Sequence, residues 1–289
     1  MTLTALSDRS IRFLKKKRER SKGMPFVEVE GARVSYRVDG QGPALVLVHG
    51  TGGDACSNWD AMTSELTKNW MVIRPDYSGS GVTEDNGAPL SIAILAHQIV
   101  AAANAAGAES FSIIGFSLGA AIAIAATAEH KERIRSLVLL NGFAHAVDAR
   151  SQLEFRFWRD LIDRDRDALA RLILLTGFTP EWFDALSVED VDAIVSRMVS
   201  ETNWSGMKRQ IDVDLLVDVR REAASLSCPT LVIGSLYDHM VSPAHGRELT
   251  RLIPGARHVE IASGHLAPME HPSRVLDVIE PFLRATPTS

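Results

Sequence analysis

The 289-residue sequence predicts an α/β fold in which a mostly parallel β-sheet is flanked by helices and carries a helical insertion. Two observations predict it. Short apolar runs of strand type alternate with stretches of helical spacing along most of the chain, which is typical of a parallel sheet wrapped by helices. The alternation stops between about Ala144 and Leu215, where helical patterns follow one another without a convincing strand.

The predicted strands begin with an antiparallel hairpin at one edge of the sheet. Two strand-like runs, 26–30 and 33–38, are joined by Gly31-Ala32, as a tight connection requires. The run 44–48 is nearly all apolar, as expected for a central strand that is covered on both faces. Later runs of the same character are 71–74, 111–114, 136–140, 230–234 and 258–261.

The stretch 144–215 is predicted to be a helical cap, so we divide the chain into a core of 24–143 and 216–286 and a cap of 144–215. Apolar residues at near-helical spacing predict three helices in the cap, the first marked by Leu153 to Ile173. Its aromatic residues are expected mostly to pack the cap's own interior. The others, Trp158 and Trp182 among them, are predicted to line an apolar cavity that binds substrate. The aromatic residues of the cap are Phe155, Phe157, Trp158, Phe178, Trp182, Phe183 and Trp204.

Composition indicates a soluble globular protein. The chain is 46% hydrophobic and 23% charged, and no stretch approaches the roughly 18 consecutive apolar residues of a membrane-spanning helix. The N-terminus lacks the apolar core of a secretory signal, so a cytoplasmic location without stable membrane insertion is expected. Cys56 and Cys228 form no CxxC or Cys/His cluster, so neither a disulfide framework nor a zinc site is indicated.

Residues 1–23 are interpreted as a basic N-terminal extension. Of the chain's 31 Lys and Arg, eight lie in residues 8–22, together with only two of its 36 Asp and Glu. A basic arm on an acidic body could contact nucleic acid, an anionic membrane or an acidic partner, but more often it is a solvated, partly helical extension. We adopt the second interpretation and expect no nucleic-acid partner. The oligomeric state stays open.

The segment Gly115-Phe116-Ser117-Leu118-Gly119 stands between an apolar strand run and an Ala-rich helical run. A serine on such a sharp strand-to-helix turn presents its hydroxyl outward, and glycines two residues to either side let the neighbouring backbone approach. The amide of Leu118 can then face a negatively charged oxygen. The alternative is that Ser117 only caps the helix that follows.

A serine nucleophile needs a histidine as base and an acid that orients the histidine ring. Asp238 follows the run 230–234 and His265 follows the run 258–261, so both stand at carboxyl ends of predicted strands. Parallel strands place these ends at one edge of the sheet, where Ser117 also lies. The order nucleophile, acid, histidine is the one associated with the serine turn. Weaker competitors are His239, His245, His258, His271 and, as the acid, Asp148.

The glycine-rich loop 49–54, His-Gly-Thr-Gly-Gly-Asp, follows an early central strand and is expected to complete an oxyanion hole. Its glycines let the backbone approach a substrate closely, and the amide of Thr51 is expected to pair with that of Leu118 around the developing charge. Gly50 in this loop and Phe116 beside the serine are predicted to contact the substrate.

These motifs together resemble the α/β-hydrolase superfamily, specifically its esterase and cofactor-free haloperoxidase-like branch, over roughly 24–284. The resemblance implies an eight-stranded, mostly parallel sheet, a helical cap inserted after the sixth strand, and a catalytic triad of Ser117, Asp238 and His265. One departure is Ser78, where many relatives carry arginine. The matching pieces are His49-Gly50, Asp76 through Gly81, Gly115 through Gly119, Asp238 with Val241 and Pro243, and Gly264-His265 with Glu270 and Pro272.

The residues and the resemblance predict a serine hydrolase that cleaves a carboxylic ester, lactone or thioester of an apolar small molecule through an acyl-enzyme, without cofactor or metal. The resemblance also allows a non-hydrolytic or C–C bond-cleaving member of the same fold, or a small-molecule receptor that keeps the triad. A dehydrogenase is a further alternative, because Gly50-Thr51-Gly52 with Ala55 fits the dinucleotide pattern G-x-G-x-x-A and Asp76 follows the next strand. That interpretation leaves the serine turn and its two partners without a purpose.

Overall fold

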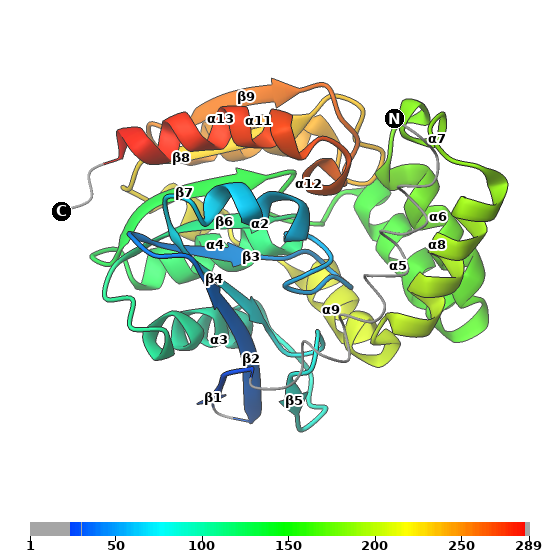
Figure 1. Ribbon diagram of the computed structural model, residues 1–289, viewed down its shortest axis with the longest axis horizontal. Coiled ribbons are helices and arrows are strands. Elements are labelled where there is room, and N and C mark those ends of the chain that lie inside the picture. The colour runs from blue at the N-terminus through cyan, green and yellow to red at the C-terminus, as the bar shows by residue number, and fades with distance from the viewer. Residues whose placement is uncertain (1–23, 30, 287–289) are drawn as a thin grey trace.

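The computed structural model describes residues 24–29 and 31–286 of the chain. The basic extension predicted for residues 1–23 lies outside this part, as does the last residue of the strand predicted at 26–30. The described residues form one central sheet with helices on both faces and a further group of helices at one side (Figure 1). The mostly parallel α/β architecture predicted from the sequence is confirmed.

The sheet contains nine strands within the described residues, eight of them in one continuous order. That order is β1 (Phe26–Val29), β2 (Ala32–Asp39), β4 (Met71–Asp76), β3 (Ala44–Val48), β6 (Phe111–Phe116), β7 (Ile134–Leu140), β8 (Thr230–Ser235) and β9 (Arg257–Ile261). The predicted hairpin β1–β2 is antiparallel, β2 also pairs antiparallel with β4, and every later pair in the order is parallel.

The ninth strand, β5 (Glu84–Asp85), corrects the expectation of eight strands. It pairs antiparallel with Ala32 and Arg33 of β2. Two acidic residues have no apolar alternation, so no pattern in the sequence indicates a strand at this position.

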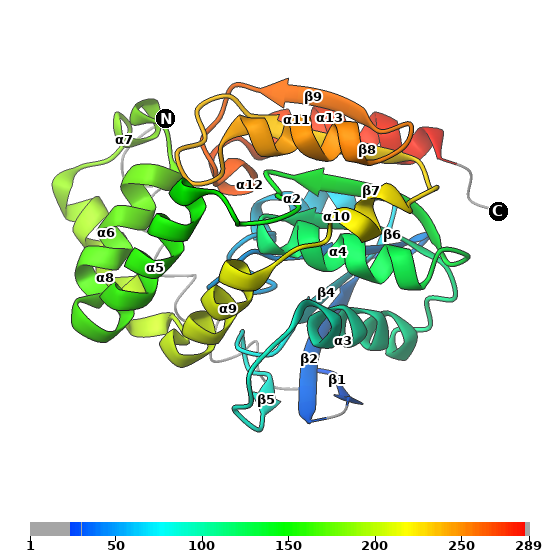
Figure 2. The ribbon, with the colours of Figure 1, turned by 180° about the vertical axis from the view of Figure 1, so that it is seen from behind.

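Helices cover both faces of the sheet because its central strands are apolar on both sides. Strand β3 is buried along its whole length, and successive side chains point to opposite faces. Leu45 and Leu47 therefore belong to one hydrophobic cluster, and Val46 and Val48 to the other. Helices α2 (Asp60–Leu66) and α13 (Pro272–Ala285) cover the first face (Figure 1). The second face is covered by α3 (Ile92–Ala105), α4 (Leu118–Glu129), α10 (Arg220–Ala224) and α11 (Pro243–Leu252) (Figure 2).

The stretch predicted as a cap is helical and follows β7. Its helices are α5 (Ala149–Arg164), α6 (Arg166–Gly177), α7 (Pro180–Phe183), α8 (Val188–Glu201) and α9 (Trp204–Leu216). Helices α5, α6 and α8 lie together beside the sheet, and α9 leads back toward it (Figure 1). The division of the chain into a core and a separate cap domain remains a prediction.

The single helix predicted from Leu153 to Ile173 is two helices. Asp165 has an extended backbone with φ −158°, which ends α5. Its side chain then accepts a hydrogen bond of 2.9 Å from the amide of Ala168 and caps α6. One capping residue inside a periodic apolar run breaks the helix without changing the period of the pattern.

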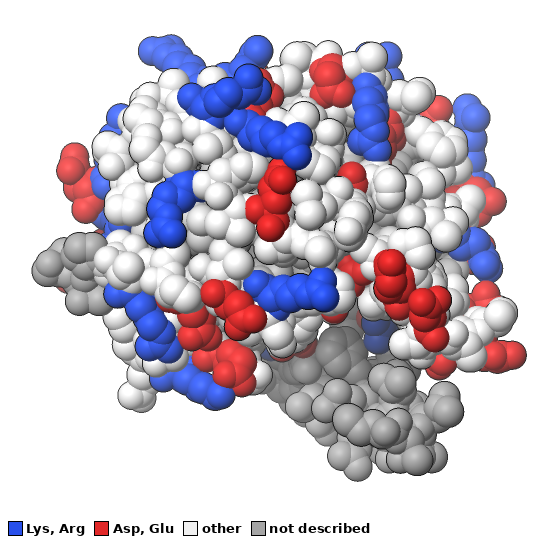
Figure 3. Space-filling view, turned by 90° about the horizontal axis from the view of Figure 1, so that it is seen from above, with Lys and Arg blue, Asp and Glu red and all other residues white. Residues whose placement is uncertain are grey.

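Charged side chains of both signs are interspersed on the face of the molecule seen in Figure 3. Among the pairs on α11, β9 and α13, Arg247 lies 2.7 Å from Glu260 and Arg284 lies 3.1 Å from Glu280. Partly exposed ion pairs of this kind contribute about 0–1 kcal/mol each to the free energy of unfolding.

Across residues 24–29 and 31–286, no helix is both long and apolar enough to cross a membrane.

Candidate active site

Ser117 lies on a sharp turn between β6 and α4 in a backbone conformation that residues other than glycine seldom adopt. Its φ is 55° and its ψ is −122°. The flanking glycines allow strand and helix to approach closely: a Cβ on Gly119 would lie 2.2 Å from the carbonyl oxygen of Val48, and a Cβ on Gly115 would lie 2.3 Å from that of Gly119. The Ser117 side chain makes no capping hydrogen bond to α4. The alternative that this serine is only a helix cap is therefore wrong.

The side chains of Ser117, His265 and Asp238 form one hydrogen-bonded series. His265 Nε2 lies 3.1 Å from Ser117 Oγ, and His265 Nδ1 lies 2.7 Å from Asp238 Oδ2. The other carboxylate oxygen, Oδ1, accepts hydrogen bonds of 2.8 Å from the amides of Met240 and Val241. Because an ionised Asp238 only accepts, it makes Nδ1–H of His265 the donor and leaves Nε2 able to take the serine proton.

Glu270 and Asn141 hold the loop that carries His265. The Glu270 carboxylate accepts hydrogen bonds from the amide of Gly264 at 2.7 Å and from the amide of Thr179 at 3.0 Å. Burial opposes ionisation of this carboxyl, but the hydrogen bonds that it accepts keep its pKa below the usual value. Asn141 Nδ2 donates to the carbonyl oxygen of His265 at 2.7 Å. The position of the histidine is thus fixed from both sides of its loop.

The glycine-rich loop 49–54 is tied to α9 by two side chains of that helix. The Thr51 hydroxyl donates to Asp214 Oδ2 at 2.7 Å, and the amide of Gly52 donates to Gln210 Oε1 at 2.8 Å. Asp214 and Gln210 are fully buried. A segment predicted as cap therefore positions a loop of the core.

The predicted oxyanion-hole residues flank the serine. Leu118 is the first residue of α4, and amides in the first turn of a helix have no acceptor within that helix. Gly50 approaches the serine so closely that a Cβ on it would lie 3.0 Å from the Cβ of Ser117. Thr51, the next residue, lines the same pocket as Ser117. That the amides of Thr51 and Leu118 bind an oxyanion stays a prediction.

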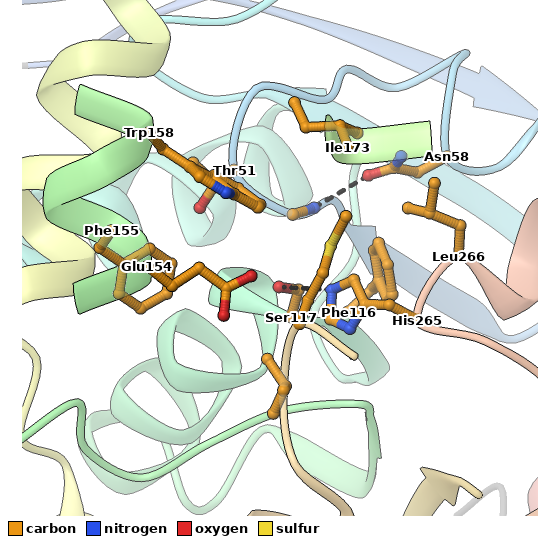
Figure 4. A pocket seen from close by; sticks show the side chains of 13 residues that line it. Thr51, Asn58, Phe116, Ser117, Glu154, Phe155, Trp158, Ile173, His265 and Leu266 are labelled. Atoms are coloured by element: carbon orange, nitrogen blue, oxygen red, sulfur yellow. Dashed lines mark hydrogen bonds between the residues drawn. The ribbon is translucent and has the colours of Figure 1, made fainter. Parts of the chain in front are cut away.

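A small cavity of about 60 Å³ contains Ser117 and His265 in its wall (Figure 4). Three of the predicted substrate-contacting residues, Gly50, Phe116 and Trp158, line it. The other lining residues are Thr51, Asn58, Glu154, Phe155, Ile173, Met240, Val241 and Leu266. Most of these side chains are apolar, as the sequence led us to expect.

Trp182, the fourth residue predicted to contact the substrate, does not line this cavity. Its ring stacks on Phe178 with centroids 3.8 Å apart and meets Phe183 edge-on at 5.0 Å. These residues belong to a hydrophobic cluster whose buried members lie in the helices of 144–215, and Leu266 and Met269 also pack against it. An abundance of aromatic residues does not tell which of them faces the sheet, so the sequence could not separate Trp182 from Trp158.

Sequence reasoning missed Glu154 and Asn58 in the pocket wall. Glu154 stands four residues before Trp158 in α5, and this spacing places both side chains on one face of a helix. That spacing is the signal that could have identified Glu154. Asn58 Oδ1 accepts a hydrogen bond of 2.9 Å from the amide of Gly50, a contact that no local pattern indicates.

The rival acid Asp148 and one of the competing histidines, His245, contact each other. Asp148 caps α5 by accepting a hydrogen bond of 2.9 Å from the amide of Ser151, and it lies 3.5 Å from His245. Among the side chains that the structure describes, His265 alone forms a hydrogen bond with Ser117 Oγ.

The acid required by the dinucleotide alternative is engaged inside the protein. Asp76 is 3% exposed and accepts a hydrogen bond of 2.7 Å from the amide of Ala55. Two residues on, the buried Ser78 accepts from Gln98 Nε2 and donates its amide to Gln98 Oε1, both at 2.8 Å. The side chains of the loop after β4 therefore form hydrogen bonds inside the protein. The uncharged pair of Ser78 and Gln98 occupies the position where the family resemblance suggested an arginine.

Replacing Asp214 by asparagine is expected to remove a pH-dependent loss of stability. Burial raises the pKa of Asp214 to about 8, in spite of the hydrogen bond from Thr51, and Asp214 Oδ1 has no hydrogen-bond partner in the part of the chain that the structure describes. The folded state thus holds a proton that the unfolded chain releases above about pH 4. The carboxyl therefore lowers the free energy of unfolding progressively as the pH rises from about 4 to about 8.

The Asp214→Asn variant cannot ionise, so its unfolding free energy should rise relative to the wild type across that range. Urea unfolding at about pH 5 and about pH 8 measures the difference. Parallel pH profiles for the two proteins would contradict the assignment of a raised pKa to this carboxyl.

Comparison with known proteins shows what the whole chain is similar to. The model of a family described as alpha/beta hydrolase fold matches residues 43–272. A pyrrolizixenacetamide deacetylase from Xenorhabdus hominickii is 47% identical over 260 residues, which cover 90% of this chain and 98% of that protein. The crystal structure of the enol-lactonase from Burkholderia xenovorans has a TM-score of 0.82 at 27% identity and covers 90% of this chain and 100% of its own. A bromoperoxidase from Bacillus anthracis, with a TM-score of 0.80, 16% identity and 91% and 100% coverage, is alike in fold alone.

Proposed function

Because this chain belongs to the α/β-hydrolase fold family and is a hydrolase of that fold, we propose that Ser117, His265 and Asp238 form a catalytic triad that cleaves a carboxylic ester, lactone or thioester of an apolar small molecule. The observation that carries the proposal is the hydrogen-bonded series from Ser117 Oγ through both ring nitrogens of His265 to Asp238. A hydroxyl within reach of a histidine that a carboxylate orients is the arrangement that activates a serine. We place this activity in the cytoplasm, because Cys56 and Cys228 are free thiols and thiols stay reduced in that compartment.

The proposed reaction passes through an acyl-enzyme. Ser117 Oγ attacks the carbonyl carbon while His265 Nε2 takes the serine proton and Asp238 stabilises the imidazolium ion. The amides of Thr51 and Leu118 stabilise the negative oxygen of the tetrahedral intermediate. His265 then gives the proton to the leaving oxygen or sulfur, and the acyl group remains on Ser117. A water molecule, activated by the same histidine, releases the carboxylic acid and restores the serine.

The size of the cavity favours a short acyl group. Its volume is about 60 Å³, and bulky side chains such as Phe155 and Trp158 border it. A small acyl group such as acetyl suits this space better than a long fatty acyl chain. The name of the relative from Xenorhabdus hominickii, a deacetylase that is 47% identical, supports the same choice. We therefore propose that the natural substrate carries an acyl group close to acetyl in size.

The proposal is tested with p-nitrophenyl esters of increasing acyl length. We expect kcat/KM to fall on the order of tenfold or more from the acetyl to the octanoyl ester, because the wall around Ser117 excludes the longer chain. Acid quench followed by mass spectrometry should find the acetyl group on the peptide that contains Ser117. Equal rates for both esters would contradict the short-acyl proposal. One product per protein molecule without further turnover would indicate a receptor rather than an enzyme.

A further inference from the structure

Glu154 is a carboxylic acid in the wall of the active-site pocket, and the triad mechanism gives it no task. Helix α5 carries it, and Figure 4 shows its carboxyl group pointing into the pocket toward Ser117 and His265. Its side chain is only 16% exposed. The neighbouring wall is largely apolar, with Phe155 and Ile173 among its residues. A single charged group in such a wall is placed to fix the orientation of a ligand.

One carboxylate oxygen of Glu154 is paired and the other is available. Oε2 lies 3.2 Å from Arg150 Nη1, whereas Oε1 has no hydrogen-bond partner among residues 24–29 and 31–286. Arg150 is half-exposed and is shared, because it also donates to the carbonyl oxygens of His239 and Met240. The arginine therefore compensates the Glu154 charge only in part.

The protein itself does not fully stabilise the charged form of Glu154. Burial raises the pKa of this carboxyl to about 7, although Arg150 and His265 act in the opposite direction. A buried carboxylate is costly unless hydrogen-bond donors surround it. A substrate that presents an N–H to Oε1 would supply the missing donor. Glu154 and His265 line the same pocket.

We propose that Glu154 is a specificity residue that accepts a hydrogen bond from an N–H of the leaving group, so that it accelerates the cleavage of amides of short carboxylic acids but not of the matching esters. The inference rests on the proposed triad and extends its chemistry to C–N bonds. The leaving group must lie next to His265, because Nε2–H of this ring supplies the proton of the leaving atom. Glu154 borders the same pocket beside that ring (Figure 4).

The benefit of such a hydrogen bond follows from how an amide is cleaved. The bond between Ser117 Oγ and the carbonyl carbon forms first, and the C–N bond then breaks while nitrogen takes the proton from His265 Nε2. Nitrogen accepts that proton through its lone pair, which must face the imidazole, so its N–H points elsewhere. A hydrogen bond from this N–H to Glu154 holds the nitrogen in the productive orientation. The amine leaves, and water releases the acid from Ser117. An ester oxygen carries no hydrogen and gains nothing from Glu154.

Three matched substrates test the proposal: p-nitroacetanilide, its N-methyl derivative, which lacks the N–H, and p-nitrophenyl acetate. In the wild type, kcat/KM for the parent anilide should exceed that for the N-methyl derivative by about tenfold or more, the effect of one hydrogen bond to a charged group. Glu154→Leu should lower the amide-to-ester ratio of kcat/KM by a similar factor. Glu154→Gln keeps an accepting oxygen and should lower the ratio less.

A control variant separates this role from a general effect of removing an acid from α5. Asp160→Leu changes an exposed acid of the same helix and should keep the amide-to-ester ratio. If Glu154 only held α5 through Arg150, then Glu154→Leu would slow both substrates alike.

The proposal is overturned if folded Glu154 variants keep the wild-type ratio. It is also overturned if the wild type cleaves the N-methyl anilide as fast as the parent, a measurement that needs no variant. Failure of the proposed function would look different, because the wild type would then release no p-nitrophenol from the acetate ester and would form no acyl-Ser117.

Discussion

Replacing Ser117 by alanine is expected to lower kcat/KM for a short-chain ester by on the order of 10⁴ to 10⁶, the range found when serine hydrolases lose their nucleophile. The variant lacks the oxygen that would form the acyl-enzyme, and water in its place is neither activated nor positioned by His265. The residual rate would come from binding and from the oxyanion hole. The fold should persist, because the Ser117 side chain makes no capping hydrogen bond to α4.

Two measurements examine the Ser117→Ala variant. Steady-state hydrolysis of p-nitrophenyl acetate gives the loss of activity, and a fluorophosphonate probe with mass detection shows whether the protein still forms a covalent adduct. Ser64→Ala removes a hydroxyl from an exposed position of α2 and should match the wild type in both. Retention of wild-type turnover by Ser117→Ala would mean that another group attacks the substrate.

The change Asp238→Asn is expected to lower kcat on the order of 10⁴-fold, as it does for the corresponding acid of a serine protease. Asp238 accepts three hydrogen bonds, from the amides of Met240 and Val241 on Oδ1 and from His265 Nδ1 on Oδ2. An asparagine has one accepting oxygen and one donating NH₂ group. If its oxygen faces His265, the NH₂ group opposes two backbone donors.

In the other orientation, the asparagine NH₂ group donates to His265 Nδ1. The proton of the imidazole then sits on Nε2, which can no longer take the proton of Ser117. Both orientations are therefore unfavourable, one for stability and one for catalysis. The exposed Asp277→Asn in α13 is the matched control and should keep the wild-type kcat. An Asp238→Asn enzyme within tenfold of the wild type would show that this carboxylate does not orient the histidine.

Much of the fold could be predicted because its signals are local. The apolar run of β3 indicates a strand covered on both faces, and the structure buries all five of its residues. The glycines around Ser117 predict a close approach of strand and helix. At Gly119, the carbonyl oxygen of Val48 lies so close that no side chain fits. Asp238 and His265 follow strands of one parallel sheet, so the topology alone brings them to the edge where Ser117 lies.

Other features had no local signal. The strand β5 consists of two acidic residues and is defined only by its backbone pairing with β2. The break between α5 and α6 depends on the conformation of Asp165 inside a periodic run. No pattern in the sequence distinguishes Trp182 from Trp158. In the structure, Trp182 packs among helices and Trp158 lines the pocket.

The sequence by itself determined the alternation of strands and helices, the strained serine turn and the positions of an acid and a histidine at strand ends. These features depend on the period at which apolar side chains recur and on the backbone conformations that each residue type allows. Both are properties of residues close together in the chain. Only the tertiary structure decided that Glu154 faces Ser117 and that Thr51 bonds to Asp214, 163 positions away. Such contacts depend on how helices pack against the sheet, because rotating a helix about its axis exchanges one face for another without altering its pattern.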